Sequence, residues 1–104
     1  MNHKPILTRL ARTDLRKIIS YIAERNFNAS LVVYRKITNS IYNLQKFPKL
    51  GTICEFNKLV RKLIVDKYII YYVVDSITKQ VSIARILHSS MDQKSHLKKT
   101  QETS

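Results

Sequence analysis

The stretch LVRKLIVDKYIIYYVV, residues 59–74, consists of two runs rich in β-branched and aromatic residues, with Asp66 and Lys67 between them. Two such runs joined by a short polar connection are typical of neighbouring antiparallel strands. The second run, Tyr68–Val74, is apolar on both faces, which favours a position in the middle of a sheet. A third run, Gln80–Leu87, follows after a turn-like connection. We therefore expect a three-stranded antiparallel meander.

Upstream of these strands, apolar residues recur at helical spacing in two segments. The first helix is expected over Arg9–Arg25, with Thr8 as its N-cap. Asn28 is the expected N-cap of the second helix, which should end at Phe47 because Pro48 disfavours helical backbone in the residue before it. The apolar stripes are Ala11, Leu15, Ile18 and Ile22 in the first helix, and Val33, Ile37, Ile41 and Leu44 in the second. A short connection predicts an antiparallel helical hairpin.

Two further segments complete the expected fold. KPIL at residues 4–7 fits a short edge strand, because Pro5 lacks the amide hydrogen that a central strand needs. KFPKLGT at residues 46–52 is the clearest turn and contains Gly51, the only glycine. The expected fold class is α+β: an N-terminal short strand and a helical hairpin pack on a three-stranded antiparallel sheet, in the order β-α-α-β-β-β.

Length and composition favour one folded unit. The 104 residues are 44% apolar, which is too high a fraction for a disordered chain. We expect a single domain over residues 1–92 and a polar C-terminal tail over residues 93–104, with one helical turn near residues 95–99. The net charge of +12 exceeds what solubility requires, and it favours a polyanionic or acidic partner.

Several classes of site are disfavoured by the residues present. Cys54 is the only cysteine, so we expect no intrachain disulfide, no cysteine-rich zinc site and a cytoplasmic location. His3, His88 and His96 lack the spacing of metal ligands, and we expect no metal and no cofactor. No apolar run approaches the roughly 18 residues of a membrane span. The N-terminus lacks the apolar core of a secretory signal.

The carboxylates do not make a convincing catalytic pair. Asp14 and Glu24 lie among basic residues on the first predicted helix. Asp66 and Asp75 lie in turns, where aspartate is favoured for its side-chain hydrogen bonds. We interpret all four as structural.

Basic residues on and beside the meander offer a stronger candidate site. The groups that could act on a phosphate are Lys58, Arg61, Lys62, Lys67, Arg85 and His88. Such cations can hold phosphates, and in a ribonuclease they would stabilise the phosphorane while the histidine serves as acid or base. The alternative is that Arg85 and His88 only hydrogen-bond backbone groups at the end of the sheet.

Three tyrosines of the central run, Tyr68, Tyr71 and Tyr72, have the type of side chain that stacks on nucleic-acid bases. In so apolar a strand, packing against the sheet face is the favoured interpretation.

From about residue 8 to residue 97, the order of these motifs resembles the ParE branch of the RelE/ParE superfamily, the toxins of type II toxin–antitoxin modules. The resemblance is carried by the helical DLRKIISYIAERN, the helix end NLQKFPKLG, the strand pair LVRKLIVDKYIIYYVV and the ending VSIARILHSSMDQKSHL. Each piece alone is weak, and the combination is specific.

The resemblance implies a small basic toxin involved in growth inhibition and plasmid stabilisation. Its partner would be an acidic, partly disordered, ParD-like antitoxin, whose other end binds operator DNA, so the toxin itself would meet operator DNA only through the antitoxin. The implied target is DNA gyrase. The family-motif candidates for function are Arg61, Tyr68, Tyr72, Arg85, His88, Met91 and Asp92.

RelE-like members of the same superfamily instead cut mRNA on the ribosome, and for that chemistry this chain offers Lys58, Arg61, Lys62, Arg85 and His88. Met91 stands where many relatives carry arginine, and no tyrosine follows His88. This ending favours a non-catalytic gyrase inhibitor over the alternative, a ribosome-dependent mRNA endonuclease. A third hypothesis is a binding module that keeps the fold and the antitoxin contact but has lost toxicity.

Overall fold

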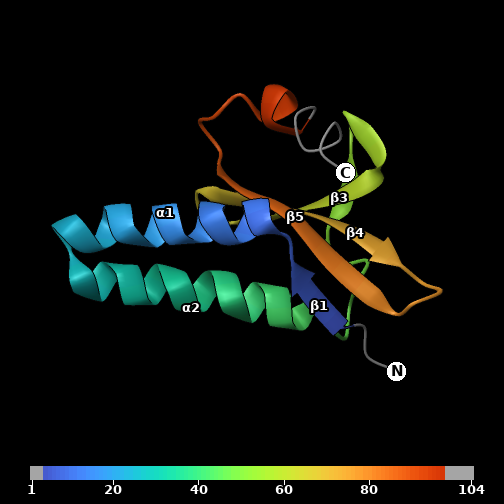
Figure 1. Ribbon diagram of the computed structural model, residues 1–104, viewed down its shortest axis with the longest axis horizontal. Coiled ribbons are helices and arrows are strands. Elements are labelled where there is room, and N and C mark those ends of the chain that lie inside the picture. The colour runs from blue at the N-terminus through green and yellow to red at the C-terminus, as the bar shows by residue number, and fades with distance from the viewer. Residues whose placement is uncertain (1–3, 98–104) are drawn as a thin grey trace.

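The computed structural model describes residues 4–97, which form a five-stranded sheet and a pair of long helices (Figure 1). The elements are β1 (Lys4–Leu7), α1 (Arg9–Arg25), α2 (Phe27–Asn43), β2 (Thr52–Cys54), β3 (Asn57–Val65), β4 (Tyr68–Asp75) and β5 (Gln80–His88). Residues 93–97 add a short helical segment. No helix in residues 4–97 has the length and apolar character needed to cross a membrane.

The predicted α+β class is confirmed, whereas the predicted number of sheet strands is wrong. The sheet order is β1-β5-β4-β3-β2, so the central position of the Tyr68–Val74 run is confirmed. β1 joins the sheet by pairing in parallel with β5, and β2 adds an antiparallel edge to β3. β2 has only three residues, too few to show an alternating pattern, and a parallel partner far along the chain leaves no local signal.

The two helices lie side by side and antiparallel, as predicted (Figure 1). Thr8 caps α1, because its Oγ1 accepts the N–H of Ala11 at 3.1 Å. The predicted cap Asn28 is wrong: Asn26 caps α2, and its Oδ1 accepts the N–H of Ala29 at 3.0 Å. Asn26 has extended backbone and also ends α1, so one residue separates the helices and Asn28 falls inside the first turn.

The end of α2 also differs from the prediction. The helix stops at Asn43, before the Phe47-Pro48 pair that was expected to end it, and residues 44–46 form a turn. The Leu44 N–H donates to Ser40 O at 3.3 Å and to Ile41 O at 3.1 Å, which shows the last turn tightening. Pro48 therefore lies in the loop after α2, and the helix ends before it in a tightened turn.

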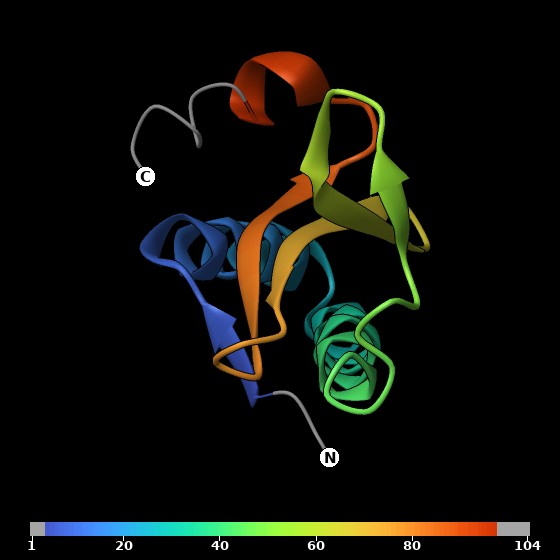
Figure 2. The same ribbon diagram turned by 90° about the vertical axis from the view of Figure 1, so that its right-hand side faces the viewer.

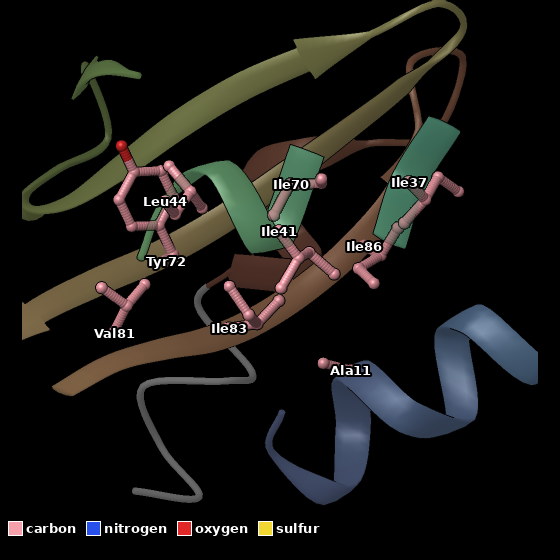
Figure 3. Packing of buried hydrophobic residues seen from close by; sticks show 9 residues of the cluster. All are labelled: Ala11, Ile37, Ile41, Leu44, Ile70, Tyr72, Val81, Ile83 and Ile86. Carbon is pink, nitrogen blue, oxygen red and sulfur yellow. The ribbon is translucent and has the colours of Figure 1, made fainter. Parts of the chain in front are cut away.

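The main core lies between the helices and one face of the sheet, which we call the helical face (Figure 3). Its buried members are Ala11, Ile37, Ile41, Leu44, Ile70, Tyr72, Val81, Ile83 and Ile86. Full burial of one isoleucine or leucine side chain contributes roughly 1.5–3 kcal/mol. The stripe positions Ala11, Ile37, Ile41 and Leu44 were all predicted from helical spacing, and they hold the hairpin against the sheet.

The opposite face of the sheet, which we call the second face, carries a smaller core of Cys54, Val60, Tyr71, Leu87 and Leu97. Leu97 belongs to the segment expected to be a polar tail, yet it is buried, and its helical turn lies across the sheet from α2 (Figures 1 and 2). The expected helical turn near residues 95–99 therefore begins at residue 93. Residues 98–104 lie outside the described residues.

A β-bulge in β5 decides which side chains reach which face. The pairing of β5 with β4 shifts between Tyr71 and Tyr72, which face Arg85 and Ile83, so Ala84 is the extra residue. Because of this shift, Ile83 and Ile86 both join the helical-face core while Arg85 lies in register with Tyr71 of the second face. The Thr8 hydroxyl lies 3.0 Å from the carbonyl oxygens of both Ile83 and Ala84, which ties the start of α1 to the bulge.

Candidate functional site

Arg85 forms a buried ion pair with Asp14 that joins β5 to α1. Its Nε donates to Asp14 Oδ2 at 2.8 Å and its Nη2 donates to Oδ1 at 2.9 Å, and the two side chains are only 8% and 11% exposed. The carboxylate also accepts the N–H of Ile86 at 3.0 Å. A two-bond fork of this kind is the strongest arginine–carboxylate geometry. Arg85 is therefore a neutralised charge inside the fold, and Asp14 is structural, as predicted.

A groove of about 410 Å³ opens beside this pair, between α1 and the chain that follows β5. Arg85 Nη1 donates to the carbonyl oxygen of His96 at 3.4 Å, so the ion pair also holds the C-terminal segment in place. Met91 lines the groove and is 42% exposed. The remaining lining residues are Leu10, Thr13, Lys17 and Ser95. Met91 and Arg85 are thus two motif candidates that line the same groove.

The end of β5 and the residues that follow it make several local contacts. His88 Nδ1 accepts the N–H of Ser90 at 3.1 Å, which leaves the ring proton of the neutral form on Nε2. The Tyr68 ring meets the His88 ring edge-on, with centroids 5.4 Å apart. Asp92 begins the short helical segment, because its Oδ1 accepts the N–H of Ser95 at 3.4 Å. His88 and Asp92 therefore both have structural roles.

Gln93 was not expected to matter, yet it fastens the C-terminal segment to the second face. Its Oε1 accepts the hydroxyl of Tyr71 at 2.8 Å, and its Nε2 donates to the carbonyl oxygens of His88 and Met91, both at 2.8 Å. Burial raises the pKa of Tyr71 to about 12, with smaller contributions from the charges of Cys54 and Glu55. The sequence could not predict this contact, because Gln93 is one polar residue among others and only the fold brings it to Tyr71.

Arg61 and Tyr72 hold the loop that follows α2. Arg61 Nη1 donates to the carbonyl oxygen of Gly51 at 2.8 Å, and the N–H of Gly51 donates to the Tyr72 hydroxyl at 2.8 Å. Burial raises the pKa of Tyr72, partly offset by the Gly51 hydrogen bond and by Arg61. A Cβ at position 51 would lie 2.5 Å from the backbone oxygen of Lys62, so only glycine fits. Both motif candidates therefore act within the fold.

Of the predicted lysines, Lys58 and Lys67 are exposed, and Lys62 of β3 is half-buried. Lys62 lies 3.2 Å from Glu55, whose side chain is 66% exposed. Strand alternation places Lys58 and Lys62 on the same face as Val60, which is the second face. Lys67 is exposed in the turn between β3 and β4.

The predicted packing of the tyrosines in the sheet is observed for Tyr71 and Tyr72, which are 1% and 0% exposed.

The predicted nuclease residues are not brought together. Lys62 pairs with Tyr71, which pairs with Arg85, so two strand spacings separate Lys62 from β5. His88 lies three residues further along β5, and strand geometry puts its backbone about 14 Å from that of Lys62. Its partner Tyr68 packs against the helical-face core, so the sheet lies between His88 and the lysines. Within residues 4–97, no three His, Cys, Asp or Glu side chains gather as metal ligands would.

The chain thus combines a short edge strand, a helical hairpin and a five-stranded sheet. The family described as the ParE toxin of type II toxin–antitoxin system, parDE, matches residues 6–93. The chain therefore belongs to the ParE toxin family.

Two solved structures are similar to the chain, and both likenesses concern the fold. One is described as the chromosomal ParDE TA system from P. aeruginosa, with a TM-score of 0.71 and 22% identity, over 83% of this chain and 95% of that chain. The other is described as the toxin–antitoxin complex RelBE2 from Mycobacterium tuberculosis, with a TM-score of 0.63 and 20% identity, over 85% of this chain and 99% of that chain. No curated protein matches the chain.

Proposed function

We propose that this toxin inhibits DNA gyrase by binding it, without cutting nucleic acid, and that an acidic antitoxin neutralises it. Family membership supports the toxin–antitoxin setting, and the resemblance to ParE implies gyrase as the target. The observation that carries the non-catalytic part is the Asp14–Arg85 fork, which engages the arginine that a nuclease would direct at phosphate. With its charge satisfied and its side chain buried, Arg85 is poorly placed to stabilise a transition state.

The position of His88 supports the same proposal. General acid–base catalysis requires the proton-transferring group to lie within hydrogen-bond reach of the reacting atom, about 3 Å, or one water away. Here the basic side chains of Lys58 and Lys62 lie on one face of the sheet and His88 on the other. A phosphate held by Lys58 and Lys62 would therefore be out of reach of the imidazole.

The proposed antitoxin is acidic and ParD-like. The net charge of +12 supports such a partner. Attraction between opposite charges speeds the encounter with an acidic protein, and repulsion between like charges disfavours binding of basic proteins. Both similar structures are described as toxin–antitoxin assemblies, which supports the same kind of partner here. We further propose that the toxin acts in the cytoplasm and meets operator DNA only through the antitoxin.

A supercoiling assay with purified gyrase tests the proposal. Micromolar toxin is expected to block supercoiling and to trap gyrase on cleaved DNA, and the product of a neighbouring acidic reading frame is expected to restore activity. The His88→Ala variant should inhibit as well as the wild type, because the proposed inhibition requires no proton transfer. Full gyrase activity with micromolar toxin that is folded by circular dichroism would contradict the proposal.

The alternative is a ribosome-dependent mRNA endonuclease, and the observation that favours it is that the exposed Lys58 and the half-buried Lys62 share one face of the sheet. Primer extension on translated mRNA would then show cuts in phase with codons, and the cuts would vanish in the Lys62→Ala variant. Uncut mRNA in cells whose growth has stopped would exclude this activity. Normal growth after induction of soluble toxin would favour the third hypothesis, a binding module without toxicity.

A further inference from the structure

A second groove lies at the end of the sheet opposite His88, between the loop after α2 and the turn from β4 to β5. It measures about 560 Å³, and we call it the loop groove. Its floor is apolar and consists of Phe47, Pro48, Leu50 and Val74. Phe47 and Leu50 are 61% and 51% exposed, which leaves a bulky apolar surface without a covering partner within residues 4–97.

Both walls of the loop groove are fixed by hydrogen bonds. On one side, Gly51 is bound through its N–H to Tyr72 and through its carbonyl oxygen to Arg61, both at 2.8 Å. On the other side, Asp75 Oδ1 accepts the N–H groups of Ile77 and Thr78 at 2.9 and 3.2 Å, which sets the turn. A site whose walls are already ordered loses little conformational entropy when it binds.

The rim of the loop groove is positively charged. Lys49 and Lys79 line it, and Lys4 lies beside Lys79, because the Lys4 N–H donates to the Lys79 carbonyl oxygen at 2.9 Å. Lys46 lies in the turn just before the groove. Asp75 is the carboxylate of the adjoining turn, and although its Oδ1 accepts two amide groups, its negative charge remains and offsets only part of the lysine charge. The rim therefore favours carboxylates from a partner.

We propose that the loop groove binds an extended acidic segment of the antitoxin, with one bulky apolar side chain on the floor and carboxylates beside Lys49 and Lys79. A disordered acidic segment can thread into a concave, lysine-rimmed groove, where apolar anchors supply affinity and charges supply orientation. A small polar ligand fits less well, because the groove lacks the convergent polar groups that such ligands need. The inference rests on the proposed function, since it takes the antitoxin as the occupant.

A peptide titration tests the chemistry of the loop groove without using toxicity. The probe is a fluorescein-labelled peptide of sequence EDEFLDE, added to the full-length toxin. We expect saturable binding, with amide NMR shifts confined to residues 47–50 and 74–79. The Lys49→Glu/Lys79→Glu variant should weaken binding at least tenfold. The Arg35→Glu/Lys94→Glu variant changes the net charge equally at exposed sites elsewhere, and it should weaken binding less than threefold.

Equal weakening in the two charge-reversed variants would overturn the inference, because binding would then reflect net charge alone. Shifts centred on other residues would overturn it as well. Leu50→Asn gives an independent check on the apolar floor, since it adds no charge: if its thermal midpoint stays near that of the wild type, peptide affinity should still fall at least fivefold.

A growth assay identifies the occupant. Cells that express the Lys49→Glu/Lys79→Glu toxin together with the antitoxin should stop growing, because the toxin escapes neutralisation. The Arg35→Glu/Lys94→Glu toxin should be neutralised by the antitoxin, and both variants should stop growth when the antitoxin is absent. Loss of toxicity with antitoxin binding retained would overturn the inference by assigning the groove to the target. If gyrase proves insensitive to the toxin, the proposed function fails while the peptide titration still reports on the groove.

Discussion

An arginine can sit on the buried end of β5 because Asp14 offsets the cost of removing its charge from water. The two side chains make two hydrogen bonds to each other, and the carboxylate makes a third to the Ile86 N–H. Removing one partner of such a pair leaves the other as an uncompensated buried charge, which is more costly than removing both. The pair therefore behaves as one unit.

This coupling gives a prediction for Asp14 and Arg85. Asp14→Leu and Arg85→Met should each lower the free energy of unfolding by about 3 kcal/mol, because each leaves an unpaired charge with little exposure. The double variant should lose clearly less than the sum of the two. Urea denaturation of all four proteins measures the coupling, and purely additive losses would show that the pair does not act as a unit.

Gly51 is a second residue whose role depends on its surroundings rather than on its own flexibility. A Cβ there would meet the Lys62 carbonyl oxygen at 2.5 Å, and the backbone of β3 cannot move aside cheaply. Gly51→Ala should therefore destabilise the protein by about 2 kcal/mol or more, in the range of overpacking costs. Lys49→Ala, an exposed change two residues away, is the control for urea denaturation and should stay within about 0.5 kcal/mol.

At the scale of elements, the helical hairpin depends on one residue, Asn26, that ends α1 and begins α2. Its side chain satisfies the Ala29 N–H, and its own N–H donates to Ile22 O at 2.8 Å. Residue type alone could not separate Asn26 from Asn28 as the cap, because both are good capping residues and only the backbone conformation decides between them.

The difference between the two asparagines can be measured directly. Asn26→Ala should lower the free energy of unfolding by about 1 kcal/mol through loss of the cap. Asn28→Ala should have little effect, because Asn28 is exposed inside the first turn of α2 and alanine favours helices. Thermal denaturation of the two variants side by side checks this, and a larger loss at Asn28 would contradict the observed cap.

Much of the fold followed from local patterns, while the candidate site did not. Helical spacing identified the buried stripe of both helices, and the apolar run of β4 identified the centre of the sheet. The pairing of Arg85 with Asp14 spans 71 residues of sequence and depends on the bulge at Ala84, which no local pattern announces. The sequence also suggested that the basic residues of β3 would lie together at one site. Strand alternation instead places the side chains of Arg61 and Lys62 on opposite faces of the sheet.

At the scale of the whole molecule, stability at alkaline pH should depend on Tyr71. Its pKa is about 12 in the folded protein against an ordinary value of 10.0, so the phenol is protonated in both states below pH 10. As pH rises from 10 through 12, the unfolded chain loses this proton first, which favours unfolding. The wild type should thus lose up to roughly 3 kcal/mol more than Tyr71→Phe over this interval.

Urea denaturation at pH 9.5 and 11.5 checks this difference between the wild type and Tyr71→Phe. The phenylalanine variant also loses the bond to Gln93, so its stability at pH 9.5 should already be lower, and only the change with pH is compared. The same pH dependence in both proteins would show that Tyr71 does not titrate as described.

The parallel pairing of β1 with β5 has a consequence for the timing of synthesis. Lys4 pairs with Gln80, so the first strand of the sheet has its partner 76 residues later, which raises the contact order of the fold. At a synthesis rate of roughly 5–20 residues per second, β1 waits on the order of 4–15 s for its partner to emerge. A nascent chain therefore lacks the finished sheet until β5 has been synthesised, and an antitoxin that is already present can meet the toxin as it completes folding.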